Sequence, residues 1–151
     1  MSNRLTNRPP EQEALRDSCV HSAQTFAEFS KEEIDQSISA RFEKIVRLYP
    51  NRLAVKMGDR ALTYDELNRY ANRIARGILQ KRGPGSEPIA LLFEHSIEVI
   101  AAIFGVLKAG KFFVALDPTF PLERISYIVE DSGAGLIATN SGNADLARQL
   151  K

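Results

Sequence analysis

Two short apolar runs, joined by an apolar segment of helical length, constrain the fold of this chain more than any other feature. Residues 89–93 and 112–116 are too short for helices and are bounded by polar or turn-forming residues, which is typical of buried strands. Residues 96–109 between them are apolar on nearly all sides, so we expect a helix covered on more than one side. A strand, a helix and a strand in this order predict a parallel pair with a right-handed crossover.

The end of this helix and the second apolar run are well marked. Gly110 follows the helix where a left-handed cap is expected, and Lys108 is a cation in the last turn, where carbonyl groups carry partial negative charge. The run 112–116 is then stopped by Asp117 and Pro118. This profile predicts a strand buried on both faces.

The pattern then repeats. Residues 122–132 place Ile125, Ile128 and Val129 on one face of a helix, a short strand is expected at 136–139, and a last helix at 143–150. The predicted fold class is therefore α/β, a partial and mostly parallel sheet flanked by helices and built from consecutive βαβ units.

A small hairpin is expected before the sheet. Residues 38–49 have the spacing of an amphipathic helix that ends before Pro50. Short strands at 53–57 and 60–63 flank Gly58 and Asp59, which suit a two-residue turn with glycine first.

The next helix has the clearest start signal of the chain. Thr63 and Glu66 have the spacing of a capping box. One face of this helix is apolar, formed by Leu67, Tyr70, Ala71, Ile74, Ile78 and Leu79. The arginines of the other face could form a phosphate or nucleic-acid surface, but we favour a solvated face, because the one aromatic residue, Tyr70, lies on the apolar side.

Charge and cysteine content exclude little. Lys and Arg number 20 against 19 for Asp and Glu, so net charge gives no reason to expect a nucleic-acid partner. In residues 1–35 the apolar residues do not recur with the period of a helix or a strand. We expect this segment to be a linker or docking tail, with the folded unit at 36–151. A single cysteine, no apolar leader and no run long enough to span a membrane lead us to expect a cytoplasmic protein without a membrane partner.

Ligands of parallel sheets usually bind beyond the carboxyl ends of the strands. Three segments qualify: 94–96, 117–121 and 140–142. In the first two, His95 could act as an acid or base and Asp117 could hold a metal, but we favour structural roles, with Ser96 capping its helix and Asp117 turning the chain. Asn140 begins a strand-to-helix junction where free amides could hold an anion, which is a weak signal.

Other motifs are weaker still. Gly133 and Gly135 precede a strand, whereas a dinucleotide fingerprint follows one. Cys19 and His21 could suggest a metal, but two ligands without a second pair do not make a site. We therefore assign no catalytic, substrate-binding, cofactor-binding or metal residue.

The order of motifs nevertheless resembles a known family. Residues 62–67 read Leu-Thr-Tyr-Asp-Glu-Leu, and about forty residues later 107–110 read Leu-Lys-Ala-Gly, followed by Leu-Asp-Pro at 116–118, Phe-Pro at 120–121, Arg124 and 127–132. Together they resemble the first two core motifs of amino-acid adenylation domains of nonribosomal peptide synthetases, in the adenylate-forming ligase superfamily. Ala115 and Lys111 depart from the usual residues.

The resemblance implies an enzyme that joins a carboxylic acid to ATP with Mg²⁺ and passes the acyl group to the phosphopantetheine thiol of a carrier protein. It also implies that the phosphate loop, the side-chain pocket and the catalytic lysine come after the second motif. We therefore expect an N-terminal piece that is scaffold and inactive alone, with the remainder of the domain, an upstream condensation domain and a carrier protein as partners.

Two further expectations follow. An alternative function is a stand-alone interaction module that uses the same fold to bind a neighbouring synthetase domain. In either case an unpaired apolar sheet edge is expected to favour self-association.

Overall fold

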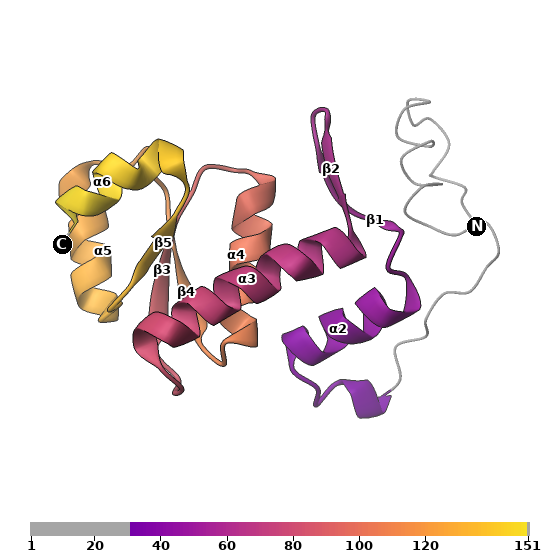
Figure 1. Ribbon diagram of the computed structural model, residues 1–151. Coiled ribbons are helices and arrows are strands. Elements are labelled where there is room, and N and C mark those ends of the chain that lie inside the picture. Colours follow the sequence, from indigo (N-terminus) through magenta and orange to yellow (C-terminus); the bar gives the residue numbers. More distant parts are fainter. Residues whose placement is uncertain (1–30, 151) are drawn as a thin grey trace, which may run out of the picture.

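Three parallel strands form a sheet between two layers of helices, and an antiparallel hairpin stands at one end (Figure 1). The computed structural model describes residues 31–150. In chain order the elements are η1 (Lys31–Glu33), α2 (Ile38–Leu48), β1 (Leu53–Met57), β2 (Arg60–Thr63), α3 (Tyr64–Arg82), β3 (Pro88–Leu92), α4 (Ile97–Lys108), β4 (Phe112–Leu116), α5 (Leu122–Ser132), β5 (Ile137–Thr139), η2 (Ser141–Asn143) and α6 (Ala144–Gln149).

The middle strand is β3, with β4 on one side and β5 on the other. Both pairs are parallel, with Ile89 opposite Phe113 and Ala90 opposite Ile137. Helix α4 joins β3 to β4, and α5 joins β4 to β5. The α/β class, the consecutive βαβ units and the small hairpin predicted from sequence are confirmed.

The core divides along the two faces of the sheet because side chains of a strand alternate. Ile89 and Leu91 point to the face covered by α3 and α4, where they meet Ile78 and Val106. Ala90 and Leu92 point to the opposite face and pack with Leu116 of β4 and Ile125 of α5. Helix α4 thus lies between the sheet and other elements, which explains why its sequence has no polar side.

The prediction that the strand at 112–116 is buried on both faces is wrong. Phe112 is 49% exposed and Phe113 is 38% exposed, and only Leu116 is fully inside. Among the residues that the structure describes, β4 pairs with β3 alone, so it is an edge strand. A continuous apolar run does not distinguish a central strand from an edge strand.

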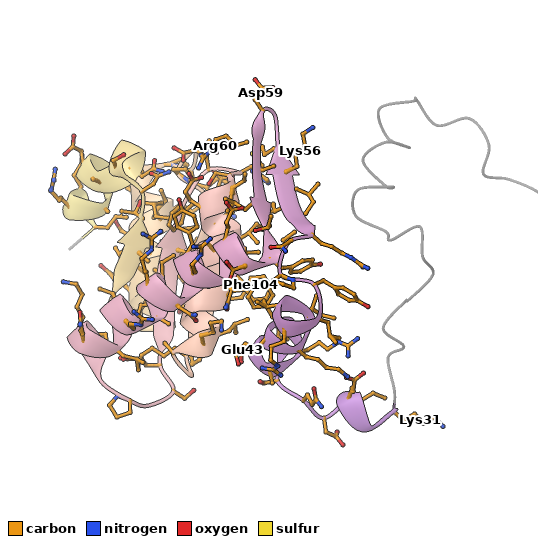
Figure 2. The ribbon with its side chains drawn as sticks, turned by 45° about the vertical axis from the view of Figure 1, so that its right-hand side comes forward. Lys31, Glu43, Lys56, Asp59, Arg60 and Phe104 are labelled. Carbon is orange, nitrogen blue, oxygen red and sulfur yellow. The ribbon has the colours of Figure 1, made fainter. Side chains whose placement is uncertain are left out.

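Helix α2 and the hairpin pack through a third cluster, away from the sheet. Phe42 and Val46 of α2 meet Leu67 of α3 and Ala101 of α4. The ring of Phe42 stacks on that of Phe104, with ring centroids 3.9 Å apart. Figure 2 shows Phe104 beside α2 at this boundary. The hairpin turns at Gly58, whose φ of 56° suits glycine, as predicted.

The start of α3 is a capping box, as its sequence predicted. The Oγ1 atom of Thr63 accepts a hydrogen bond from the Glu66 backbone N–H at 3.3 Å, and Glu66 Oε2 accepts one from the Thr63 N–H at 2.8 Å. The Thr63 backbone N–H and, at 3.0 Å, the Thr63 hydroxyl both donate to Glu66 Oε2, and these two bonds lower the pKa of Glu66 below its ordinary value. Two donors that a helix start leaves unpaired are therefore satisfied.

Replacing Thr63 with alanine is expected to lower the free energy of unfolding by about 1 kcal/mol, because the cap bond is lost. Urea denaturation of the full chain measures this loss. Thr63→Ser keeps the hydroxyl and is the control, expected near the parent. An unchanged midpoint for Thr63→Ala would show that the cap does not stabilise this helix start.

The apolar face predicted for α3 is correct for its middle but not for its rim. Leu67, Ala71 and Ile78 are buried, whereas Tyr70 is 44% exposed and Leu79 is also exposed. The helix turns by about 100° per residue, so a wide apolar stripe extends past the line of contact with α4. Tyr70 therefore lies at the exposed margin of the apolar face, where it borders the same cleft as Ile74.

Candidate functional site

The carboxyl ends of the three parallel strands meet at one edge of the sheet, and two of the three predicted segments join there. The Oε2 atom of Glu94, after β3, accepts a hydrogen bond from Asn140 Nδ2, after β5, at 3.0 Å. This bond is the largest reason why the pKa of Glu94 is lowered. The structure thus brings Glu94 and Asn140 together, although they are far apart in sequence.

Asp117 follows β4 and does not join this pair. Its Oδ1 atom accepts hydrogen bonds from the Thr119 N–H at 2.9 Å and the Thr119 hydroxyl at 2.7 Å. These bonds, with a smaller contribution from His95, lower the pKa of Asp117. The carboxylate therefore serves the local turn, which is the role that the sequence favoured.

The predicted role of Ser96 is only half correct. Ser96 occupies the N-cap position of α4 with an extended backbone, but its side chain makes no capping hydrogen bond to the helix. The side chain is instead one of the smaller causes that lower the pKa of Glu98. A capping residue type at the right position does not ensure the rotamer that makes the bond.

At the junction after β5, one of the backbone amides is already paired within the chain. Asn140 Oδ1 accepts from both the backbone N–H and the side-chain Nδ2 of Asn143, at 3.1 and 3.0 Å. The Asn143 amide is thus not available to an anion, and η2 and α6 are both too short to make a strong helix N-terminus. The weak anion signal of this segment finds no support in this geometry.

Gly133 and Gly135 do not form a nucleotide loop. Gly133 is the left-handed C-cap of α5, with φ of 65° and ψ of 24°. At Gly135 an added Cβ would lie 2.4 Å from Arg82 Nη2, so this glycine leaves room for a guanidinium group of the same chain. Both glycines therefore have structural roles, which agrees with the interpretation that they are not a dinucleotide fingerprint.

A cleft of about 210 Å³ opens beside the carboxyl ends of β3 and β5. Its rim carries an ion pair between Arg60 of the hairpin and Glu98 of α4, with Nη1 and Oε1 2.6 Å apart. In Figure 2 the hairpin presents Arg60 on the side that faces α4 and Lys56 on the opposite side. The apolar wall of the cleft is formed by Ile74, Phe93, Ile97, Ala101, Ala102 and Ala138.

The rim of this cleft was not predicted from sequence. Arg60 and Glu98 are 38 positions apart and become neighbours only because the hairpin folds over α4. The ion pair is the first cause of a lowered pKa of Glu98. Both charges are thereby committed to each other, so the cleft presents an apolar wall and a neutralised pair rather than a free acid, base or nucleophile.

The arginine face of α3 is partly self-paired. Arg69 Nη2 lies 3.2 Å from Asp65 Oδ2, one turn earlier, and the guanidinium of Arg73 lies 4.4 Å from the centre of the Tyr70 ring. On this exposed face, Arg69 and Arg73 interact with side chains of the same helix. These contacts leave the solvated-face interpretation in place.

Lys108 has a role beyond the helix end. Its side chain is nearly fully buried, its Nζ pairs with Glu43 of α2, and the same Nζ lies 5.8 Å from the centre of the Phe42 ring. Lys108 therefore ties α4 to α2 as well as neutralising the end of its helix. The sequence predicted the position of Lys108 in the last turn of the helix, but not its ion pair with Glu43.

Lys111, one of the departures from the usual family pattern, is a buried cation. Its side chain is 0% exposed, and Nζ lies 2.7 Å from Glu87 Oε1 and 3.0 Å from the Gly85 carbonyl oxygen. Glu87 also accepts from Arg82, with Nη2 at 2.6 Å from Oε2. The ammonium thus fastens the loop before β3 to the start of β4.

These two bonds hold the pKa of Glu87 at about 2, against an ordinary value of 4.5, with Arg82 the larger cause and Lys111 the next. Because the folded pKa is lowered, the stabilisation is present above pH 4.5 and is lost as the pH falls toward 2. Glu87→Gln is therefore expected to be less stable than the parent at pH 7, with the difference shrinking below pH 4.5. Thermal melts across this range measure it, and a constant difference would contradict the network.

The described part of the chain holds few other chemical groupings. Within residues 31–150 no set of three or more His, Cys, Asp or Glu side chains is placed to hold a metal ion. No helix in that range is both long enough and apolar enough to cross a membrane. The pair Cys19 and His21 lies outside the described residues, so its interpretation stays a prediction.

Comparison with known proteins places most of the chain in one family. Residues 42–151 match the family model described as AMP-binding enzyme. Gramicidin S synthase 2 of Brevibacillus brevis is 44% identical over 107 residues, which make up 71% of this chain and 2% of that protein. Tyrocidine synthase 1 of Brevibacillus parabrevis is 36% identical over 115 residues, which make up 76% of this chain and 11% of that protein.

Solved structures agree with this placement. The nonribosomal peptide synthetase FmoA3 matches with a TM-score of 0.70 and 31% identity, covering 73% of this chain and 12% of that chain. The N-terminal subdomain of Klebsiella oxytoca NpsA shares the fold, with a TM-score of 0.63 and 22% identity over 70% of this chain and 28% of its own. The chain spans only a small part of each of these relatives. It belongs to the AMP-binding enzyme family, in which its sequence and fold match the adenylation part of nonribosomal peptide synthetases.

Proposed function

We propose that this chain supplies the first part of the N-terminal subdomain of an amino-acid adenylation domain. The observation that carries the proposal is the match of residues 42–151 to the AMP-binding enzyme model, with peptide synthetases among the relatives. The complete enzyme would join a carboxylic acid to ATP with Mg²⁺, release pyrophosphate, and transfer the acyl group to the phosphopantetheine thiol of a carrier protein.

Within that enzyme the chain acts as scaffold. Two groups that could serve ATP or Mg²⁺ are engaged within the chain: the Asn143 amide is bonded to Asn140, and the Asp117 carboxylate is bonded to Thr119. Arg60 and Glu98 likewise neutralise each other. We therefore assign nucleotide and metal binding to other parts of the enzyme, and we expect no adenylation by these 151 residues alone.

This role requires partners. The first is the remainder of the adenylation domain, since the matched residues are 12% of the FmoA3 chain. A carrier protein would receive the acyl group, and an upstream condensation domain would use it. The compartment we propose for this assembly is the cytoplasm.

The test is a chimera. In the adenylation domain of gramicidin S synthase 2, the 107 matched residues are replaced by their counterparts from this chain. Pyrophosphate exchange with ATP, Mg²⁺ and a panel of amino acids should exceed that of the same domain with those residues deleted. This chain alone should give background exchange.

Two results would contradict the proposal. Exchange above background by this chain alone would show that it holds a complete active site. A folded chimera without exchange would show that its scaffold cannot replace that of a working adenylation domain.

A further inference from the structure

The outer edge of β4 combines exposed apolar side chains with an unpaired backbone. Within residues 31–150, β4 pairs with β3 alone, and Phe112, Phe113 and Ala115 are all exposed. Sheet edges are commonly protected from pairing by a proline, a bulge or an outward lysine. Lys111, directly before β4, is buried and bonded to Glu87, so it does not protect this edge.

The hydrogen-bonding groups on this edge belong to Phe113 and Ala115. The Phe112 N–H donates to the Glu87 carbonyl oxygen at 3.4 Å, so Phe112 directs its backbone groups toward β3. Successive residues of a strand direct their N–H and C=O groups to alternate edges. Phe113 and Ala115 therefore direct theirs away from β3, and each offers one donor and one acceptor.

This pattern of donors and acceptors fits a second copy of the same strand in an antiparallel register with Val114 on the two-fold axis. Phe113 of each copy then lies opposite Ala115 of the other, and the two residues exchange both N–H···O=C bonds. Two such pairs give four hydrogen bonds in all. The same patch is used by both copies, as a closed two-fold dimer requires.

The side chains are complementary in this register as well. Val114 and Leu116 pack on the face of the sheet that α5 covers, so Phe113 and Ala115 lie on the opposite face. The Phe113 ring of each copy therefore meets the small side chain of Ala115 from the other. On the α5 face, Phe112 of one copy lies opposite Leu116 of the other, which gives the exposed Phe112 ring an apolar neighbour.

We propose that β4 is a self-association surface, through which two copies of this chain join their sheets by antiparallel pairing of β4 with β4, centred on Val114. Strands of five residues make a small interface, below the roughly 1,200 Å² of stable complexes, so the dimer dissociates on dilution. The pairing involves neither ATP nor an acyl group, so it can hold or fail whether or not the proposed function does.

Sedimentation equilibrium of the full chain over a concentration series tests this pairing. Ala115→Pro removes one N–H per copy from the open edge and none that is bonded to β3, and edge strands tolerate proline at such a position. Two of the four hydrogen bonds are lost, so the dissociation constant should rise by roughly tenfold or more. Ala115→Ser keeps the N–H and should match the parent. A parent that stays monomeric, or equal dissociation constants for the two variants, would overturn the proposal.

Cross-linking tests the register without relying on the proline variant. In a Cys19→Ser background, Val114→Cys places two thiols opposite each other, within the Cα separation of a disulfide. Phe112→Cys is the control, because residue 112 is more exposed, yet its two copies would lie about 13 Å apart along the paired strands. Under mild oxidation Val114→Cys should form the covalent dimer at least tenfold faster. Equal rates would overturn the proposal.

Residue-resolved hydrogen exchange distinguishes this edge from any other contact between copies. In dilute monomer the Phe113 and Ala115 amides should exchange quickly, while the Val114 amide, which faces β3, is protected. In concentrated dimer the first two should slow together by roughly tenfold or more. A dimer in which both amides remain fast would place the contact elsewhere and overturn the proposal.

Discussion

Replacing Ile89 with alanine is expected to lower the free energy of unfolding by about 2–5 kcal/mol. Ile89 is fully buried in the central strand and packs against Ile78 of α3 and Val106 of α4. The smaller side chain leaves a cavity between the sheet and both helices, which strand and helices cannot close by moving together. Domains of this size have about 5–15 kcal/mol of stability in all, so the loss is a large share.

Urea denaturation with a fitted slope gives this loss directly. The control is Ile38→Ala in α2, where the same atoms are removed from a side chain that is 65% exposed. That change should remain within about 0.5 kcal/mol of the parent. Equal losses at both positions would mean that β3 is not the centre of the core.

Gly105→Ala is expected to destabilise the chain even though alanine is the better helix former. An added Cβ at Gly105 would lie 2.6 Å from Ile74 Cγ2 and 3.1 Å from the Ala71 carbonyl oxygen. Overpacking of this kind costs about 1–3 kcal/mol, and the backbone atom cannot turn away as a side chain can. The gain in helix propensity is only about 0.5–1 kcal/mol. The cost of overpacking therefore outweighs it, and the free energy of unfolding should fall.

The matched control is the other helical glycine, Gly77 in α3. A Cβ there meets nothing within 4 Å. Gly77→Ala should therefore raise stability by about 0.4–1 kcal/mol. Thermal melts of both variants should show shifts of opposite sign, and a stabilised Gly105→Ala would show that α3 and α4 do not approach as closely as described.

Much of the fold could be predicted because its signals are local. The capping box at Thr63, the hairpin turn at Gly58 and the left-handed glycine after α4 all depend on residues within a few positions of one another. The parallel order followed from strand, helix and strand in succession, since a crossover leaves few alternatives. Helix and strand positions accordingly agree with the structure to within one or two residues.

The candidate site was predictable only in part. Glu94 and Asn140 were identified because both follow a strand, but their hydrogen bond depends on β3 and β5 being neighbours. Arg60 and Glu98 carried no signal, since neither belongs to a motif and their pairing requires the hairpin to fold over α4. Ser96 was misjudged because residue type does not fix a side-chain rotamer.

The sequence by itself determined the class of the fold, the ends of its helices and the family, since each depends on residue types at fixed spacing. Tertiary structure alone decided which apolar residues are exposed, which charges are paired and which sheet edge is open. Phe112 and Ile89 belong to equally apolar runs, yet one lies on an edge strand and the other in the middle. Burial depends on the neighbours of a strand, and the order of strands in a sheet is not the order of the chain.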